Sequence, residues 1–197
     1  MPAGDLVSQR DFFWGQAVFY SIFNLIIDTI AVVFAGLLLL RFWMQAVRVR
    51  PPLSLGQFMF RLTDWLVLPL RRVLPGVGGY DWASLLGAFL IALLSVALVL
   101  TIRSAFAVEP LLLLSLLSMV HWIGYGFIGL LFIEVIFSWV NPHAPLAPLV
   151  RALNEPLMRP LRRVIRPIGG IDLSPLVAFL LLRIAVYVAE GLLLGMA

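Results

Sequence analysis

A basic polar segment occurs twice in this chain, and every matched position is 91 residues apart. The first copy reads Pro69-Leu70-Arg71-Arg72-Val73 and then Gly78-Gly79-Tyr80-Asp81; the second reads Pro160-Leu161-Arg162-Arg163-Val164 and then Gly169-Gly170-Ile171-Asp172. Each copy stands between two long apolar runs. The unit of apolar run, polar segment and apolar run is therefore built twice, which predicts one architecture made of two similar halves.

The composition is that of a membrane protein. The chain is 62% hydrophobic and 12% charged, with a mean hydropathy of +1.06, and a bilayer-spanning helix needs about 20 apolar residues. We therefore predict an all-α membrane protein with four transmembrane helices. The predicted spans lie near residues 22–40, 82–101, 115–139 and 173–196. The predicted organisation is an N-terminal lead at residues 1–21, a first repeat at 22–110 and a second repeat at 111–197.

The arginines predict how the spans are oriented. All 14 basic residues are arginine; segment 41–81 holds six of them and segment 141–172 holds five, whereas Arg10 and Arg103 lie on the opposite side. Positive charge is enriched in cytoplasmic loops, so both basic segments are expected in the cytoplasm and both termini in the periplasm. The two hairpins would then run parallel to each other. Asp5 and Asp11 stand where a signal peptide carries positive charge, so we expect the first apolar run to be retained as a span.

Each basic segment is expected to contain a cytoplasmic amphipathic helix in the headgroup plane. In the first copy, Asp64 is predicted to point away from the apolar face, and the corresponding position of the second copy is Glu155. Asp81 and Asp172 directly precede the second and fourth spans, where a carboxylate can cap free N–H groups. The apolar positions are Leu55, Phe58, Met59, Leu62, Leu66 and Leu70, and then Leu149, Ala152, Leu153, Pro156 and Leu157 in a shorter, proline-interrupted version.

These motifs resemble the YggT family over nearly the whole chain, from about residue 25 to 190. The resemblance is carried by Leu40-Arg41-Phe42-Trp43-Met44-Gln45 with the first arginine pair, and by Ser138-Trp139 with Glu155-Pro156-Leu157 and the second pair. It implies a bacterial inner-membrane protein with relatives in cyanobacteria and plastids. The family is associated with osmotic or extracytoplasmic stress, and its relatives with division or nucleoid distribution. No biochemical activity comes with the family.

The two halves differ in ways that predict different duties. Trp43 and Trp139 correspond, but the stretch from tryptophan to the acidic residue is five residues longer in the first half. Arg41 corresponds to Phe137, and only the second half carries an arginine, Arg183, within a span.

Five ionisable residues fall inside the predicted spans, where each must find water or a partner. One interpretation is a polar pathway for protons or ions; the other, which we favour, is contact between helices. We expect an ion pair between Glu134 and Arg183, and we expect Asp28 to face the bundle beside Ala31 and Ala35. A seam of small residues in the second span is also expected to pack inside. The ionisable residues are Asp28, His121, Glu134, Arg183 and Glu190, and the seam is Ser84, Ala88, Ala92 and Ser95.

The repeated arginine pairs allow two roles. They could only fix topology, or they could bind anionic lipid headgroups or an acidic membrane, division or stress protein partner. The repeated proline, glycine and aspartate framework favours defined geometry; nucleic acid is not an expected partner, and a homo-oligomer is an open option. The residues concerned are Arg71, Arg72, Arg162 and Arg163.

The sequence lacks the motifs of common enzymes. It has no P-loop, no G-x-S-x-G, no H-E-x-x-H and no dinucleotide fingerprint. It has no cysteine, and its two histidines are His121 and His143, so neither a metal site nor a cofactor is expected. Two function classes remain. The first is a structural or organising membrane protein, and the alternative is a small ion channel or transporter subunit that uses the ionisable residues of the spans.

Overall fold

The structure is a computed structural model that describes residues 3–74, 76, 78–103, 106–165 and 172–195, with side chains from residue 18 onward. These residues form helices joined by short connections, and the described ranges contain no strand. The helices are α1 (Ala3–Ala46), α2 (Leu53–Val73), α3 (Trp82–Ile102), α4 (Val108–Val140), α5 (Ala147–Val164) and α6 (Ser174–Gly195).

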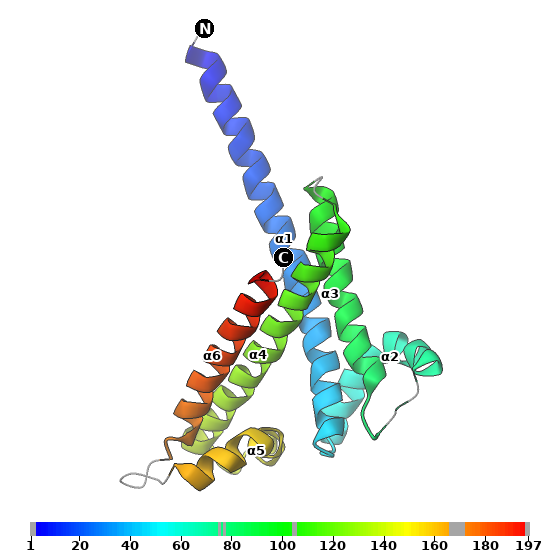
Figure 1. Cartoon of the computed structure of the whole chain (residues 1–197), viewed down its shortest axis with the longest axis vertical. Helices are drawn as coiled ribbons and strands as arrows, with labels where there is room; N and C mark the ends of the chain where they lie inside the picture. The colour runs from blue at the N-terminus through cyan, green and yellow to red at the C-terminus, as the bar shows by residue number, and fades with distance from the viewer. Residues whose placement is uncertain (1–2, 75, 77, 104–105, 166–171, 196–197) are drawn as a thin grey trace.

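Four of the helices are long and apolar enough to cross a membrane, which confirms the predicted number of spans. The chain is therefore a multi-pass membrane protein. The apolar segments run through 18–46, 82–102, 108–140 and 174–195. The third is longer than expected: with 33 residues, α4 extends about 50 Å. Such a helix exceeds the thickness of a bilayer core, and a span of this length can be accommodated by tilting. In the structure α4 runs obliquely to α1 (Figure 1).

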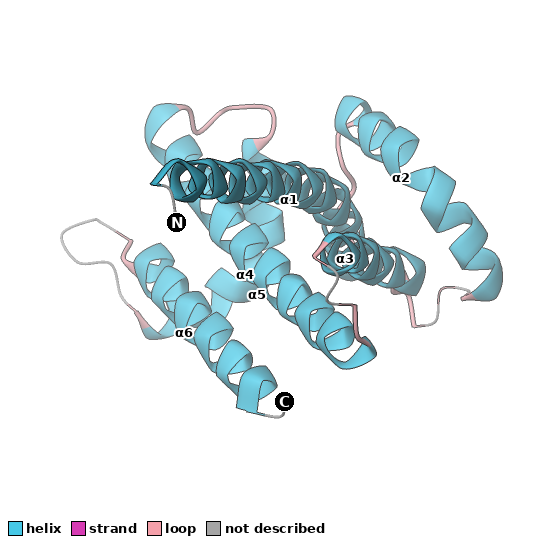
Figure 2. Cartoon of the chain, turned by 90° about the horizontal axis from the view of Figure 1, so that it is seen from above, coloured by secondary structure: helices cyan, strands magenta, loops and turns pink. Residues whose placement is uncertain are grey.

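The spans pack as two hairpins that meet through α4. Helix α1 packs on α3 and α4 packs on α6, while α4 also contacts both α1 and α3. Helix α2 rests on α1 and α3, and α5 rests on α4 and α6. Both short helices lie across the same end of the spans (Figure 1), and they lie apart from each other when the molecule is seen from above (Figure 2).

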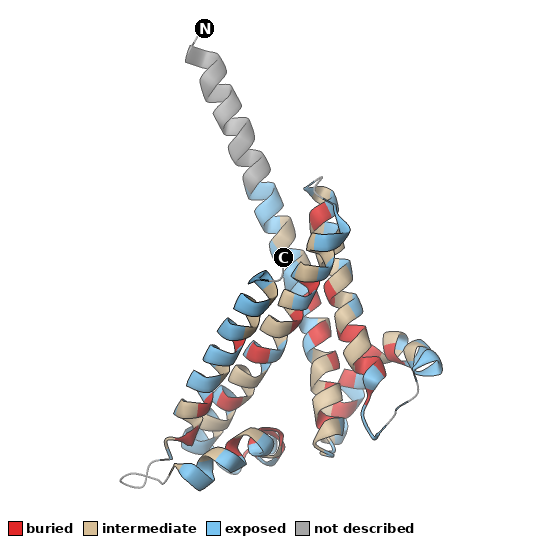
Figure 3. Cartoon of the chain, in the orientation of Figure 1, coloured by how far each residue is buried: buried red, intermediate tan, exposed pale blue. Residues whose placement is uncertain are grey.

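The predicted small-residue seam is confirmed as the contact between α1 and α3. Ser84, Ala88 and Ala92 are fully buried, and they pack near Ala35, which is also fully buried. Ser95, at the outer end of the seam, is half-buried. Small side chains let two helix backbones approach closely, and close packing holds helices together in lipid. The buried positions form stripes on the facing sides of the spans, whereas the outer sides are exposed (Figure 3).

The short helices each bury one stripe of side chains against the spans. In α2 the buried positions include Met59, Thr63 and Val67, spaced by four residues. This stripe is rotated from the expected one, because Phe58 is 57% exposed. In α5 the buried positions are Ala147, Leu149, Val150, Leu153, Asn154 and Met158. The buried stripes therefore contain polar residues, Thr63 and Asn154, among the apolar ones.

The N-terminal lead is continuous with the first span, because α1 starts at Ala3 and runs without a break to Ala46. Towards its N-terminal end α1 continues away from the other spans (Figure 1). After α2, Gly78 and Gly79 adopt φ of 69° and 83°, a backbone region that glycine enters without steric cost. The corresponding Gly169 and Gly170 lie outside the described residues.

Candidate functional site

Arg41 is the hub of a group of five residues that we call the first polar centre: Arg41, Thr63, Asp64, Arg71 and Asp81. Its Nη1 donates hydrogen bonds to Thr63 Oγ1 at 2.9 Å and to Asp64 Oδ1 at 2.6 Å. Its Nε lies 3.3 Å from Asp81 Oδ2. Asp64 was predicted to point away from the apolar face of its helix; its side chain is 38% exposed, but its carboxylate contacts the buried guanidinium of Arg41 on α1.

Asp81 joins the end of α2 to the start of α3. Arg71 donates to both of its carboxylate oxygens, from Nη2 to Oδ2 at 2.6 Å and from Nε to Oδ1 at 3.3 Å. The same carboxylate accepts from the Ser84 hydroxyl at 2.7 Å and caps the first turn of α3 at the Ser84 amide, 3.4 Å away. Because its side chain is 2% exposed, Asp81 is a buried charge whose partners all come from its own repeat.

Burial and charge act in opposite directions on Asp81. Burial by itself raises the pKa of this carboxyl, but the hydrogen bonds from Arg71 and Ser84 and the charges of Arg71 and Arg41 outweigh it. The pKa of Asp81 therefore lies below its ordinary value. The folded protein therefore stabilises the ionised carboxylate of Asp81 relative to its protonated form.

The second half of the chain contains a corresponding group, the second polar centre: Glu134, Asn154, Glu155, Arg162 and Asp172. Arg162 is its hub, with Nη2 donating to Glu134 Oε1 at 3.1 Å and Nε donating to Asp172 Oδ2 at 3.0 Å. Glu155 lies 3.7 Å from Arg162 Nη1. Asn154 Nδ2 donates to Glu134 Oε2 at 2.8 Å and to the Leu130 carbonyl at 2.9 Å.

Asp172 and Arg162 stabilise each other's charged forms. Burial raises the pKa of the Asp172 carboxyl, but hydrogen bonds from Ser174 and Arg162 and the charge of Arg162 outweigh burial, so this pKa lies below its ordinary value. Burial lowers the pKa of Arg162, but hydrogen bonds and charges from Asp172 and Glu134 raise it above its ordinary value. Asp172 also accepts from the Ser174 amide, at 2.9 Å, at the start of α6.

Four residues of the first centre correspond to four residues of the second by the 91-residue offset. The fifth residue of each centre has no such counterpart: it is an arginine in the first centre and a glutamate in the second. The related pairs are Thr63 and Asn154, Asp64 and Glu155, Arg71 and Arg162, and Asp81 and Asp172. The first span contributes Arg41, whereas the third contributes Glu134. The first centre is therefore balanced, with two arginines and two carboxylates, whereas the second has one arginine and three carboxylates.

The two centres also differ in burial. The side chains of Arg41 and Asp81 are 7% and 2% exposed, whereas those of Arg162 and Asp172 are 36% and 38% exposed. Water can screen the excess negative charge of the second centre, while the first centre depends on internal pairing. This is the physical reason why the balanced centre is the buried one.

The predicted ion pair between Glu134 and Arg183 is wrong. Glu134 binds Arg162 and Asn154 in the α5 region, whereas Arg183 Nη1 donates to the Tyr125 hydroxyl at 3.2 Å and its guanidinium lies over the Tyr125 ring. Tyr125 precedes Glu134 by nine residues, which is about 13 Å along a helix. Counting residues from the ends of the spans fails because α4 is long and tilted.

Two other ionisable residues of the spans meet further from α5. His121 and Glu190 form a pair between α4 and α6, and the His121 ring stacks on Tyr125. Asp28, in contrast, is exposed, so the prediction that it faces the bundle is wrong. By helical spacing Asp28 lies near the face of Ala31 and Ala35, but burial of this face begins only at Ala31.

The four arginines of the repeated turns fall into two classes. Arg71 and Arg162 are held in the polar centres, whereas Arg72 and Arg163 are exposed and have no polar partner among the described residues. Other arginines in the same part of the molecule share this state. The exposed and unpaired arginines of the connection before α2, of α2 and of α5 are Arg48, Arg50, Arg61, Arg72, Arg151, Arg159 and Arg163.

Arg48 also has an unusual backbone. Its φ is 60°, and this left-handed conformation costs a non-glycine residue about 1–2 kcal/mol. The Arg48 amide donates to the Gln45 carbonyl at 3.1 Å, and the Val49 amide donates to the Met44 carbonyl at 2.9 Å. These two bonds form the motif that commonly ends a helix with glycine at this position, so α1 ends with an arginine where glycine would be less strained.

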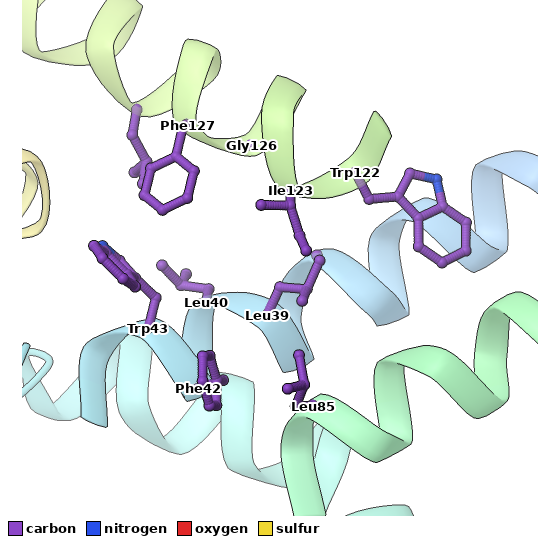
Figure 4. A pocket seen from close by; sticks show the side chains of 11 residues that line it. Leu39, Leu40, Phe42, Trp43, Leu85, Trp122, Ile123, Gly126 and Phe127 are labelled. Carbon is purple, nitrogen blue, oxygen red and sulfur yellow. The ribbon is translucent and has the colours of Figure 1, made fainter. Parts of the chain in front are cut away.

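An apolar cavity of about 340 Å³ lies between α1, α3 and α4 (Figure 4). Trp43 and Phe127 line one end of it and pack edge to face, with ring centroids 4.9 Å apart. Leu39, Leu85 and Trp122 line its other end. The lining is hydrocarbon and aromatic, which suits an apolar chain and offers no ligand to an ion.

Neither polar centre is built as a metal site. Over the described residues there is no cluster of histidine, cysteine, aspartate or glutamate arranged to hold a metal ion. The three carboxylates of the second centre surround Arg162 instead. Both centres are arrays of ion pairs and hydrogen bonds between neighbouring helices, although Arg41 Nε and Asn154 Oδ1 are buried without a hydrogen-bond partner in the described part of the chain.

Thr63 and Asn154 were not predicted as site residues, and Arg41 was predicted only to differ from its counterpart in the second half. A signal for the first two was present: each is a polar residue that directly precedes the acidic residue of its amphipathic helix, at the same repeat position. No sequence signal indicates that Arg41 reaches both Asp64 and Asp81.

The fold and its polar centres define a class: a multi-pass, all-helical membrane protein in which ion pairs hold two short helices across one end of four spans. The family described as CCB3/YggT matches residues 20–102 and again 113–193, so the chain belongs to this family. The two matches cover the two proposed repeats separately.

Several bacterial relatives are similar over most of their length. An uncharacterised protein of Pseudomonas aeruginosa is 39% identical over 164 residues, covering 81% of this chain and 83% of the relative. The protein named "Uncharacterized protein YggT" of Escherichia coli is 31% identical over 160 residues, covering 81% and 84%. A Vibrio alginolyticus protein, named for the region 3′ of proC, is 34% identical over 166 residues, covering 82% and 90%. No solved structure matches the chain.

Proposed function

We propose that this protein is a structural or organising protein of the bacterial inner membrane, and not an enzyme, whose basic cytoplasmic end binds anionic lipid headgroups. The observation that carries the proposal is the concentration of exposed, unpaired arginines in and beside α2 and α5, which lie at the same end of the spans. In this proposal the two halves are parallel hairpin repeats, and both termini face the periplasm.

The two arginines of each pair have different structural roles, and this difference supports the proposed function. Arg71 and Arg162 hold the short helices against the spans, which leaves Arg72 and Arg163 free one residue further along. An arginine close to an anionic membrane surface contributes about 1 kcal/mol of attraction. Several arginines on firmly held helices would therefore gather anionic lipid around the protein, or dock an acidic membrane, stress or division protein.

The experiment compares lipid that co-purifies with the full-length protein. We expect the wild type to be enriched in phosphatidylglycerol over phosphatidylethanolamine, and the enrichment to fall in the double variant Arg72→Gln and Arg163→Gln. The matched control is Arg103→Gln, at the opposite end of α3. If a correctly inserted double variant retains the same lipid enrichment, these arginines do not bind lipid and serve only to set topology, which contradicts the proposal.

A channel or transporter subunit is the competing function, and the pairs Arg183–Tyr125 and His121–Glu190 between α4 and α6 favour it. Flux of ions into proteoliposomes separates the two functions. Reproducible flux that is lost in Glu190→Gln or Arg183→Gln would show that lipid organisation is not sufficient. A stress-linked role, osmotic stress above all, is part of the proposal only through the family resemblance.

A further inference from the structure

We propose that the groove between the end of α1 and α2 binds the phosphate group of one anionic phospholipid headgroup. This site deepens the proposed lipid-binding function and rests on it, but it involves different residues from Arg72 and Arg163. The groove has a volume of about 610 Å³ and combines cationic with apolar walls. Its cationic walls come from Arg41, Arg48, Arg50 and Arg71.

The charge of the groove is not neutralised from within. Asp64 is its one lining carboxylate, and Asp81 lies behind Arg41 and Arg71. These two carboxylates balance Arg41 and Arg71, so Arg48 and Arg50 supply two surplus positive charges. Both are exposed and have no polar partner within the described part of the chain. Arginine suits phosphate because its planar fork can donate two parallel hydrogen bonds to two oxygens.

The backbone holds Arg48 at the groove despite strain. Its left-handed φ of 60° occupies a position where glycine commonly ends a helix. Strained backbone persists where the surroundings require it, and such positions cluster at functional sites. At this position the conformation turns the chain from α1 towards Pro51 and α2, and it leaves the Arg48 side chain on the groove wall.

The difference between the two repeats also points to this groove. The stretch from tryptophan to the acidic residue is five residues longer in the first repeat, and Arg48 and Arg50 lie in that stretch. At the corresponding connection of the second repeat the groove is smaller, about 340 Å³, and its charged lining residues are Arg151 and Glu155. That groove has no surplus charge. The longer connection therefore gives the first repeat an anion site that its counterpart lacks.

The location and the apolar wall favour a lipid over free phosphate. Gln45 Nε2 donates to the Gly79 carbonyl at 3.1 Å, which places the groove where α1 ends and α3 is about to begin. Phe42, Tyr80 and Trp82 cluster beside it, as aromatic residues do at a membrane interface. Met59, Phe60 and Leu68 supply the apolar wall, which suits the glycerol and upper acyl part of a lipid.

The test uses delipidated full-length protein in detergent, titrated with phosphatidylglycerol and followed by native mass spectrometry. We expect one lipid to bind more tightly than the others, and we expect phosphatidylethanolamine with the same acyl chains to bind more weakly. In the variant Arg48→Gly with Arg50→Gln, the tight event should weaken about 10- to 30-fold. Glycine relieves the strain at position 48, so this loss cannot be assigned to unfolding if the melting temperature is unchanged or higher.

Two further variants separate this site from the proposed function. Arg151→Gln, in the smaller groove of the second repeat, should leave the tight event intact. Arg72→Gln with Arg163→Gln should reduce the general, salt-sensitive enrichment of anionic lipid and also leave the tight event intact. Loss of that event in this variant and not in the groove variant would overturn the groove assignment while keeping the proposed function.

A last arm distinguishes the source of the phosphate group. Inorganic phosphate at millimolar concentration should not displace the bound phosphatidylglycerol. If inorganic phosphate at this concentration displaces phosphatidylglycerol, the lipid assignment is overturned in favour of a soluble anion. Wild-type binding in the groove variant overturns the site altogether.

Discussion

Trp43 and Leu153 join the two halves of the protein: the indole Nε1 of Trp43 donates a 2.9 Å hydrogen bond to the main-chain carbonyl of Leu153, 110 residues further along the chain. The same indole packs edge-on against Phe127 of α4. The end of the first span is thus attached to the short helix of the second repeat. This contact adds to the packing of α4 on α1 and α3, which holds the two hairpins together.

We expect Trp43→Phe to destabilise the protein by about 1 kcal/mol, because it removes the hydrogen bond and leaves most of the packing. Trp43→Ala should cost about 3–5 kcal/mol. Trp139, its counterpart in the second repeat, is 83% exposed, so Trp139→Phe is the matched control. Thermal unfolding in detergent measures all three, and equal losses for Trp43→Phe and Trp139→Phe would contradict the contact.

Asp81 and Asp172 occupy the same repeat position but should differ in their contribution to stability. Replacing Asp81 by asparagine leaves the buried Arg41 without one of its two carboxylates, and breaking a buried pair costs about 3–5 kcal/mol. Asp172 is more exposed, so Asp172→Asn should cost about 1 kcal/mol or less. Chemical unfolding of both variants gives the comparison; a larger cost at Asp172 would reverse the assignment of the buried centre.

Stability should fall on acidification below about pH 4. The pKa values of Asp81 and Asp172 are lowered in the folded protein, whereas an unfolded aspartate titrates near 3.9. The stabilisation is therefore complete above about pH 4 and is lost as the pH falls through the lower, folded values. Melting temperatures between pH 3 and 7 test this. The fall in melting temperature between pH 7 and pH 3 should be smaller in Asp81→Asn than in the wild type. An identical pH profile would show that protonation of Asp81 does not cause the fall.

Gly124 and Gly126 should respond differently to the same substitution. A methyl group built on Gly124 would overlap the side chain of Val186, where α4 meets α6, whereas one on Gly126 would meet no atom within 4 Å. Gly124→Ala should cost about 1–3 kcal/mol through overpacking, and Gly126→Ala should be tolerated. The second change Val186→Ala should recover part of the loss. Recovery of folded protein after heating, measured by size-exclusion chromatography, distinguishes these outcomes.

The orientation of the protein in the membrane is also testable. The excess of arginine near α2 and α5 predicts that both short helices are cytoplasmic and both termini periplasmic. Reporter fusions at the C-terminus and after α5 should therefore give opposite signals. A cytoplasmic signal from the C-terminal fusion would contradict the prediction and place the basic end outside.

The helical spans and the family could be predicted from the amino-acid sequence. Apolar length predicted four spans, small-residue spacing predicted the seam at Ala88 and Ala92, and motif spacing indicated the YggT family. These properties depend on residues that are near one another in sequence, because helix periodicity and span length are local. For the same reason the spacing of Asp81 and Asp172 before their spans was enough to propose helix caps.

Which charged groups contact one another depends on the packing of the helices and could not be predicted from the sequence. Arg71 and Arg72 look equivalent in the sequence. Because α2 packs against α1 and α3, Arg71 pairs with Asp81 and Arg72 remains exposed. In the same way, packing of α5 against α4 pairs Glu134 with Arg162 and not with Arg183. The partner of a side chain on a membrane helix depends on the tilt, rotation and relative height of the neighbouring helices. Helical periodicity sets the face on which a residue lies, but contacts between distant segments set the height at which that face meets another helix.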